Sequence, residues 1–248
     1  MHSPYGLDLI DSCLSCKMRA GHRFCKLSPA ALQTLEKIKY TTAYPQSTVL
    51  FLEGQPSRGI FVLCQGRAKV SVSARDGRTV ILKITEPGEV LGLSATVSGS
   101  PYETTAVTID PCQVSLVRRE DTIQFLKHNS EACFKVAEEL ADRYRAVCHE
   151  LRCLGLSHSA GQKLAKLLLE WSCRKHQSSA FTQGIRMDLT QEEIAQMIGT
   201  TRETVTRLFA QFKKHRIAQL NSSILLIRDK GALKSLASHD NPNALRIG

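Results

Sequence analysis

Hydrophobic and polar residues alternate with a period of two from Thr48 to about Val117, where glycines separate short runs of β-branched residues. Asp76-Gly77, a dipeptide typical of tight hairpin turns, lies between two of these runs. The strand-like runs are VLFLEG, GIFVLCQG, RAKVSVSARDG, RTVILKITEPGE and QVSLV. About seven strands at this spacing predict an antiparallel barrel or roll. Ahead of them, Ser28-Pro29 predicts the start of a helix that reaches about Tyr40.

After Asn129 or Ser130, the hydrophobic period changes from two to about 3.6 residues. Apolar side chains then recur at alternating steps of four and three, as in the seam of a coiled coil. The seam residues are Cys133, Ala137, Leu140, Tyr144, Val147, Leu151 and Leu154. Such a helix could pack on its own roll, but a seam of this length is more typical of a helix that pairs with its twin. We therefore expect residues 129–155 to form the dimerisation helix of a homodimer.

A third pattern, from Leu189 to His215, fits a helix-turn-helix. Thr190 and Glu193 predict a capping box at the start of a short helix, and Gly199 supplies the tight turn after it. Thr200 or Thr201 can cap a second helix. The expected buried face of that helix carries Val205, Leu208, Phe209 and Phe212. The runs Ile217–Leu220 and Ile224–Ile227 then predict a small hairpin, which makes the domain a winged helix.

The opposite face of the second helix carries Arg202, Glu203, Thr206 and Arg207, which project together away from the predicted core. Arginine can donate two hydrogen bonds to guanine O6 and N7, and glutamate can accept one from the cytosine amino group. An exposed face with an Arg–Glu ion pair is the alternative, but the turn pattern favours sequence-specific reading of double-stranded DNA. Thr190 and Thr201 are also expected to lie at the DNA. The cations expected to contact its phosphates are Lys213, Lys214 and Arg216.

These patterns predict an α+β protein whose segments follow one another along the chain. Gly155-Leu156-Ser157 breaks the long helix, so we place the hinge there. The predicted parts are a cysteine-containing N-terminal segment (1–26), a roll (27–128), the dimerisation helix (129–155), a winged helix-turn-helix (156–240) and a tail (241–248).

The net charge of +10 lies mostly in the C-terminal part, where 14 Lys and Arg oppose 7 Asp and Glu from Leu156 onward. A basic surface favours a polyanionic partner because each cation that meets a phosphate releases a counterion, although a solvated basic surface has the same composition. The apolar runs are too short to cross a bilayer and no signal pattern opens the chain, so we expect a soluble, cytoplasmic protein.

Three of the nine cysteines, Cys13, Cys16 and Cys25, lie close together near the N-terminus. In a reducing compartment a structural disulfide is disfavoured, which leaves a metal site, a redox dithiol or unliganded thiols. A thiol oxidoreductase would place its CxxC at a strand-to-helix junction of an α/β fold, and no such pattern follows, so we do not expect an enzyme. The cysteines in apolar segments, predicted to be core or seam residues, are Cys64, Cys133, Cys148, Cys153 and Cys173.

A glycine-punctuated roll, a long dimer helix and a C-terminal winged helix together resemble the CRP/FNR superfamily of bacterial transcription regulators. The resemblance runs from about Leu27 to Leu236, includes TTRETVTRLF and implies a cyclic-nucleotide-binding-like jelly roll. By that likeness Arg202, Glu203 and Arg207 read a TGA-containing half-site, repeated as an inverted palindrome, and RNA polymerase is a further expected partner. Glycines at the expected turns of the roll are Gly54, Gly66, Gly77, Gly88 and Gly92.

The sequence departs from the cyclic-AMP branch of that superfamily. The branch holds its ligand with a Gly-Glu-Leu segment and an Arg-Ser pair, whereas this chain has Gly92-Leu93-Ser94 and Thr104-Thr105. A buried phosphate without a cation is strongly disfavoured, so cyclic AMP is not the expected ligand. A regulator controlled by another small ligand in the roll, with no metal, stays open as the alternative.

The chain is nearer the FNR-type branch, whose oxygen sensors hold a 4Fe-4S cluster with three N-terminal cysteines and one in the roll. By that resemblance Cys13, Cys16, Cys25 and Cys112 are the candidate ligands, and oxygen, redox state or nitric oxide is the candidate signal. The gap from Cys16 to Cys25 is longer than in the best-known members, and a cysteine at the roll position also occurs in members without a cluster. Zinc would accept the same four thiolates.

Overall fold

The computed structural model describes residues 4–16, 24–155, 159–174, 184–187, 189–221 and 224–237. The chain forms two compact units, Met1–His149 and Glu150–Gly248. The division falls inside a helix, and Leu156 and Ser157 of the predicted hinge lie outside the described residues. Among the helices that the structure describes, none is long and apolar enough to cross a membrane.

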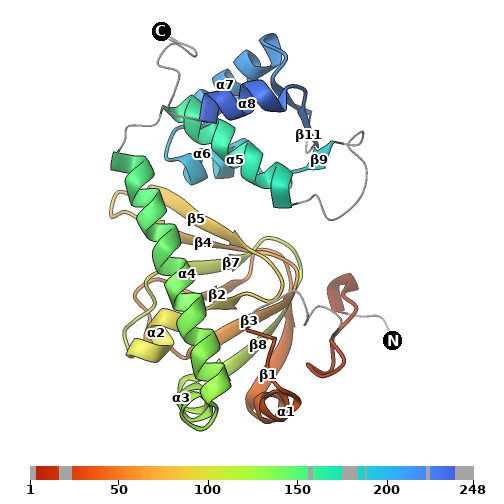
Figure 1. Ribbon diagram of the computed structural model, residues 1–248, viewed down its shortest axis with the longest axis vertical. Coiled ribbons are helices and arrows are strands. Elements are labelled where there is room, and N and C mark those ends of the chain that lie inside the picture. The colour runs from red at the N-terminus through yellow and green to blue at the C-terminus, as the bar shows by residue number, and fades with distance from the viewer. Residues whose placement is uncertain are drawn as a thin grey trace. The chain divides into compact units, whose positions relative to one another are not determined.

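The first unit contains an antiparallel roll of two four-stranded sheets (Figure 1). One sheet has the order β1-β8-β3-β6, formed by Lys39–Tyr44, Cys112–Arg118, Gly59–Gln65 and Val90–Leu91. The other has the order β2-β7-β4-β5, formed by Val49–Phe51, Thr105–Thr108, Ala68–Ser73 and Thr79–Thr85. The predicted Asp76-Gly77 turn joins β4 to β5, with Gly77 at φ +85°. The antiparallel roll expected from the alternation is thus confirmed.

Helices and a short turn complete this unit. They are η1 (Pro4–Gly6), α1 (Pro29–Ile38), α2 (Leu93–Ser98), α3 (Arg119–His128) and α4 (Ser130–Gly155). The Ser28 side chain caps α1, as predicted, by accepting from Ala31 N. The chain leaves that helix at Lys39 and pairs with β8 as a strand, so the predicted continuation of the helix to Tyr40 is wrong. Pairing with β8 outweighs the local helical pattern there.

In the β1-β8-β3-β6 sheet, strands β3, β6 and β8 are buried on both faces, whereas β1 is largely exposed. On β3, Phe61 and Leu63 face the roll interior, whereas Ile60 and Val62 face an outer core. The outer core contains side chains from α1, α3 and α4 and from the segment around Phe24. Because neighbouring side chains on a strand point to opposite faces, β3, β6 and β8 each contribute to two separate environments.

The long helix α4 packs against that outer core through Ala132 and Val136, with Leu140 partly buried beside them. Arg143 adds a hydrogen bond to the carbonyl oxygen of Val90 in the roll and an ion pair to Glu139. The first four turns of α4 are therefore held to the roll by one apolar stripe and one cation.

The second unit is a winged helix-turn-helix. Its elements are α5 (Ala160–Arg174), β9 (Ile185–Arg186), α6 (Gln191–Ile198), α7 (Arg202–Lys214), β10 (Ala218–Asn221), β11 (Ile224–Ile227) and α8 (Lys230–Ala237). The predicted hairpin is present as β10 and β11, and β9, which the sequence did not reveal, pairs with β11 as a third strand. The predicted winged helix is thus confirmed.

Candidate functional site

The turn between α6 and α7 is built by three local devices. Thr190 Oγ1 accepts from Glu193 N at 3.1 Å, and Glu193 Oε2 accepts from Thr190 N at 3.0 Å, which completes the capping box. Gly199 ends α6 at φ +66°, a conformation that favours glycine. Thr201 Oγ1 then accepts from Thr204 N and caps α7. Together these contacts fix where α7 begins.

The two faces of α7 differ in burial. Val205, Leu208, Phe209 and Phe212 are buried in the unit. The residues predicted to read bases are all exposed and lie on the other side: Arg202, Glu203, Thr206 and Arg207. The backbone amide of Glu203 and the Thr201 side chain hold the pKa of the Glu203 carboxyl below its usual value, so the carboxylate is ionised and can accept hydrogen bonds. This face presents two guanidinium groups and one carboxylate to solvent.

Cations surround the wing end of α7. Lys213, Arg216 and Arg228 line one pocket there, together with Ala218 and Gln219. Lys214, Thr190 and Thr201 are also exposed, although both threonine hydroxyls already cap helices. Such a cluster of cations beside the exposed polar face of α7 is suited to phosphate oxygens, which carry no sequence information.

On α4, the predicted seam residues have different surroundings. Leu140 is partly buried against the roll, whereas Ala137, Tyr144 and Val147 are exposed. Phe134, which the sequence analysis did not include, is 64% exposed, and Tyr144 and Val147 are 72% and 52% exposed. The side chains of Leu151 and Leu154 lie outside those that the structure describes. These large exposed apolar side chains favour a partner surface.

The N-terminal cysteines meet at one pocket against the outer face of the β1-β8-β3-β6 sheet. Cys13, Cys16 and Cys25 all line it, and so does Cys64 of β3. Other lining residues are Ile10, Phe24, Leu32, Leu35, Lys39, Val62, Leu63, Gly88, Ser115 and Val117. Lys39 Nζ donates to Cys13 Sγ at 3.1 Å, and Cys64 Sγ lies 3.4 Å from Ser115 Oγ. Cys64, which the sequence analysis treated as a core residue, therefore shares a pocket with the three N-terminal thiols.

Residues 8–13 are tied to the roll and to α1 by hydrogen bonds. Gln113 holds Ile10 from both sides, since its Oε1 accepts from Ile10 N and its Nε2 donates to Ile10 O, each at 2.8 Å. Glu36 Oε1 accepts from Ser12 Oγ and from Cys13 N, each at 2.5 Å. Gln65 also donates to the carbonyl oxygen of Asp8. These contacts place Cys13 at the pocket.

The pKa values reflect how close these thiols are. Burial, followed by the charges of Cys64, Cys13 and Cys16, raises the pKa of the Cys25 thiol to about 12, although Lys39 acts in the opposite direction. Burial also raises the pKa of the Cys64 thiol, and Cys13 and Cys16 add to that effect. Each thiolate would therefore disfavour the ionisation of its neighbours.

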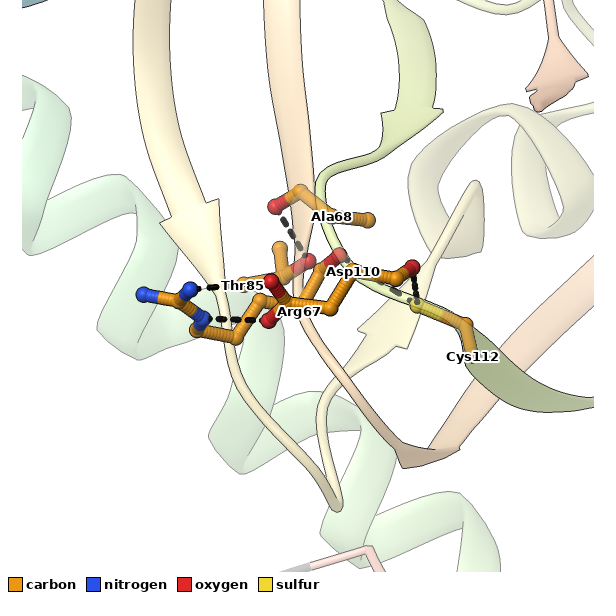
Figure 2. A network of polar contacts seen from close by, with 5 residues as sticks. All are labelled: Arg67, Ala68, Thr85, Asp110 and Cys112. Carbon is orange, nitrogen blue, oxygen red and sulfur yellow. Dashed lines mark hydrogen bonds and ion pairs between the residues drawn. The ribbon is translucent and has the colours of Figure 1, made fainter. Parts of the chain in front are cut away.

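Cys112, the fourth ligand expected from the resemblance, lies elsewhere. It is fully buried in the roll interior with Val114. Its Sγ donates to the carbonyl oxygens of Arg67 and Asp110, beside the Arg67–Asp110 ion pair (Figure 2). A Cβ on Gly66 would lie 2.6 Å from this sulfur, so the thiol is tightly enclosed. The structure does not bring Cys112 to the pocket of the other three cysteines.

The interior of the roll is filled by aromatic side chains near the segments that depart from the cyclic-AMP pattern. Phe51 and Tyr102 stack with ring centroids 4.2 Å apart, and the Tyr102 hydroxyl donates to Gly59 O at 2.8 Å. At the N-terminus of α2, Ser94 Oγ donates to Glu103, while Thr105 Oγ1 accepts from Glu53 N. Neither segment presents a cation.

Among the described residues, no group of three or more His, Cys, Asp or Glu side chains is arranged to hold a single metal ion. The four cysteines thus surround a pocket rather than one point. Their donor set is all thiol, which suits iron-sulfur clusters and other soft metal centres.

Two family models match the chain, and together they cover roughly two thirds of it. The cyclic nucleotide-binding domain matches residues 41–129, which contain most of the roll. The Crp-like helix-turn-helix domain matches residues 162–236, which contain α6, α7 and the wing. Regulators with this type of helix-turn-helix bind DNA and act as dimers.

Known proteins resemble the chain over nearly its whole length. A "CRP-like cAMP-activated global transcriptional regulator" of Mycobacterium tuberculosis is 28% identical over 85% of this chain and 93% of its own. "Transcriptional activatory protein AadR" of Rhodopseudomonas palustris is 24% identical over 90% of this chain and 92% of its own. The structure of FixK2 from Bradyrhizobium japonicum shares the fold, with a TM-score of 0.71 and 22% identity over 82% of this chain and all of that one.

These relatives are transcription regulators, which favours a regulatory over an enzymatic role. The two domains occur in the same order as the roll and the winged helix described above. The exposed polar face of α7 supplies what such a domain needs to read DNA. The chain is a DNA-binding transcription regulator and belongs to the CRP/FNR family.

Proposed function

We propose that this protein is a homodimer that binds an inverted repeat with TGA-containing half-sites and responds to oxygen, redox state or nitric oxide through a 4Fe-4S cluster at its N-terminal cysteines. One observation carries the proposal: Cys13, Cys16 and Cys25 converge on one pocket at the outer core. The proposed partners are palindromic operator DNA, a second copy of the chain and RNA polymerase, in the cytoplasm.

The reading face of α7 supports the half-site. Arg207 and Arg202 can each hold a guanine through O6 and N7, and Glu203 can accept from a cytosine on the other strand. Because two copies related by a two-fold axis present the same face, the operator is expected to be palindromic. The exposed apolar strip of Phe134, Tyr144 and Val147 on α4 supports pairing of the two copies.

The thiol pocket suits the cluster by donor chemistry, since thiolates are the usual ligands of such clusters. A bound 4Fe-4S cluster would supply reactivity toward oxygen and nitric oxide. The chain's own residues do the rest. Gln113 and Glu36 hold residues 10–13 against the roll, and Lys39 places a positive charge beside Cys13.

A path of contacts joins the pocket to the dimer helix. Cys13 and Cys25 pack against the same outer core as Ala132 and Val136 of α4. Glu131, in the first turn of α4, accepts from Ser28 N at 3.0 Å. A change in how the N-terminal segment packs therefore reaches α4 through the shared outer core and the Ser28–Glu131 hydrogen bond. It would alter pairing and hence DNA affinity, because one half-site alone binds weakly.

The test is anaerobic purification of the full chain, followed by iron and acid-labile sulfide analysis and by DNA binding before and after air. The expected preparation is brown, bleaches in air and loses DNA affinity together with its visible absorbance. Gln33→Ala, at an exposed position of α1, is the control and should behave as the wild type. A colourless anaerobic preparation with reduced thiols and unchanged DNA affinity in air would refute the sensing proposal.

A regulator controlled by a small ligand in the roll is the second candidate, because the cyclic nucleotide-binding model matches the roll and the Mycobacterium tuberculosis relative is named cAMP-activated. Titration calorimetry with cyclic AMP on the full chain separates the two. Micromolar binding that raises DNA affinity in air would favour this candidate over the cluster. We expect no binding, since Gly92-Leu93-Ser94 and Thr104-Thr105 offer no cation to the phosphate.

A further inference from the structure

The faces of β8 separate the cysteine of the roll from the N-terminal thiols. Cys112 and Val114 point into the roll interior, whereas Val117 belongs to the outer core and Ser115 lines the thiol pocket. A strand residue cannot change faces without a shift of register. Cys112 would have to leave a site with two sulfur hydrogen bonds and cross the sheet to join the others.

On the neighbouring strand, Cys64 already faces the pocket. The pairing of β3 with β8 is regular as far as Leu63↔Val114, then shifts, and resumes at Gln65↔Gln113. Cys64 is the extra residue of this bulge. Strand alternation places Cys64 on the same face as Ile60 and Val62, which belong to the outer core, and bulges of this kind are common beside functional sites.

We propose that Cys13, Cys16, Cys25 and Cys64 form one four-thiolate site for a soft metal centre, with Cys64 rather than Cys112 as the ligand from the roll. The identity of the centre as an iron-sulfur cluster rests on the proposed function, but the four-thiol site does not. Each sulfur binds as the thiolate, so its proton passes to solvent on loading. Lys39 leaves one positive charge beside Cys13 to balance the negative charge of the site.

Ser115 gives the proposal a sharp second test. Its Oγ lies 3.4 Å from Cys64 Sγ and it lines the same pocket from the adjacent strand. A thiol moved from position 64 to position 115 would therefore reach the same centre. The double variant Cys64→Ser, Ser115→Cys is expected to restore what Cys64→Ser alone removes.

The first experiment compares Cys64→Ser, Cys112→Ser and the double variant as full chains, each reconstituted anaerobically with ferrous iron and sulfide. Visible absorbance and bound iron are the readouts. Cys64→Ser should bind the centre more than about tenfold more weakly, because even changes outside the ligand shell cost that much. Cys112→Ser and the double variant should load as the wild type does.

Loss of loading in Cys112→Ser with normal loading in Cys64→Ser would overturn the assignment, and so would normal loading in both. Circular dichroism and the melting temperature of the metal-free chains show whether each variant folds. Cys64→Ala, which leaves no oxygen in place of the sulfur, serves as the second variant and should fail to load in the same way.

A cadmium titration keeps the four-thiol site separate from the proposed function. Cd²⁺ added to the reduced, metal-free chain gives an ultraviolet charge-transfer band that grows with each thiolate bound. The band should be smaller in Cys64→Ser than in the wild type and unchanged in Cys112→Ser. If the wild type takes up no iron and sulfide but passes this test, the sensing proposal fails and the site stands. An unchanged band in Cys64→Ser would refute the site itself.

Discussion

Glu36 should control how firmly the N-terminal segment is docked. One of its oxygens accepts from both Ser12 Oγ and Cys13 N, each at 2.5 Å. A hydrogen bond to a charged group is worth about 1.5–3 kcal/mol, and partial exposure to water places these two at the lower end or below it. Removing both in Glu36→Ala should therefore cost about 2 kcal/mol, which is roughly 30-fold in the equilibrium between docked and released segment.

Hydrogen exchange of the Ile10 amide measures that equilibrium. Ile10 N donates to Gln113 Oε1 rather than to Glu36, so it exchanges faster only if the whole segment is released more often. In Glu36→Ala we expect about a 30-fold faster exchange at Ile10 and unchanged exchange within α1. Glu36→Gln keeps an acceptor oxygen without the charge, and its effect should be about half in free energy.

Gln33→Ala, at an exposed position on the same helix, is the matched control and should leave amide exchange at Ile10 and within α1 unchanged. The reasoning fails if Cys13 exchanges faster in Glu36→Ala while Ile10 does not. That result would mean that residues 10–13 open one contact at a time, so that Glu36 holds Cys13 locally and does not dock the segment as a unit.

Three further predictions concern other parts of the chain. Tyr144→Asp places a charge on the exposed strip of α4 and should weaken dimerisation about 100-fold or more in sedimentation equilibrium, whereas a monomeric wild type would refute the seam. Arg207→Ala should cost about 1–3 kcal/mol on the preferred operator and relax base preference at one position in selection experiments, while Lys213→Ala should weaken all sequences alike and lower the salt slope by about 0.9. The Ser28 N–H lowers the pKa of the Glu131 carboxyl from its ordinary value of 4.5. The contact therefore stabilises the fold above pH 4.5, and this stabilisation is lost as the pH falls through the lowered pKa. The melting temperatures of the wild type and Glu131→Gln should differ at about pH 7 and converge in acid.

The elements that the sequence predicts well are those set by neighbouring residues. Thr190, Glu193 and Gly199 specify a cap and a left-handed turn within ten residues, and the structure contains both. The wing and the roll follow from alternation and turn dipeptides in the same way. In each case the residues that decide the conformation are also the residues that make the contacts, so no distant information is needed.

Elements set by distant partners were missed. The helix was predicted to reach about Tyr40, yet Lys39–Tyr44 is a strand because its backbone pairs with β8 about seventy residues away. In α3 only Thr122 and Phe125 are buried, so too few apolar positions exist for a helical period to appear in the sequence. Local patterns carry no signal for pairing that loop closure makes possible only in the folded chain.

The thiol pocket shows the same distinction at a functional site. QVSLV alternates, so the sequence alone already places Cys112 on the face of Val114 and opposite Ser115, an argument that the resemblance to other regulators did not use. GIFVLCQG places Cys64 on the face of Ile60 and Val62, but β3 is buried and apolar on both faces, so the pattern does not tell which face lies toward the roll interior. The face of Cys64 could therefore come only from the structure.

The position of the thiol pocket also bears on how a signal can reach DNA. Cys25 packs in the same outer core as Val136 of α4, so a repacking there acts on the side of α4 that faces the roll. Tyr144 and Val147 are exposed further along the same helix and do not line the thiol pocket. A rigid helix transmits a shift of its first turns to its later turns, because its backbone hydrogen bonds hold successive turns together. Control of pairing through α4 therefore requires a small displacement of one helix, biased by whether residues 8–16 are docked, and no unfolding of the roll.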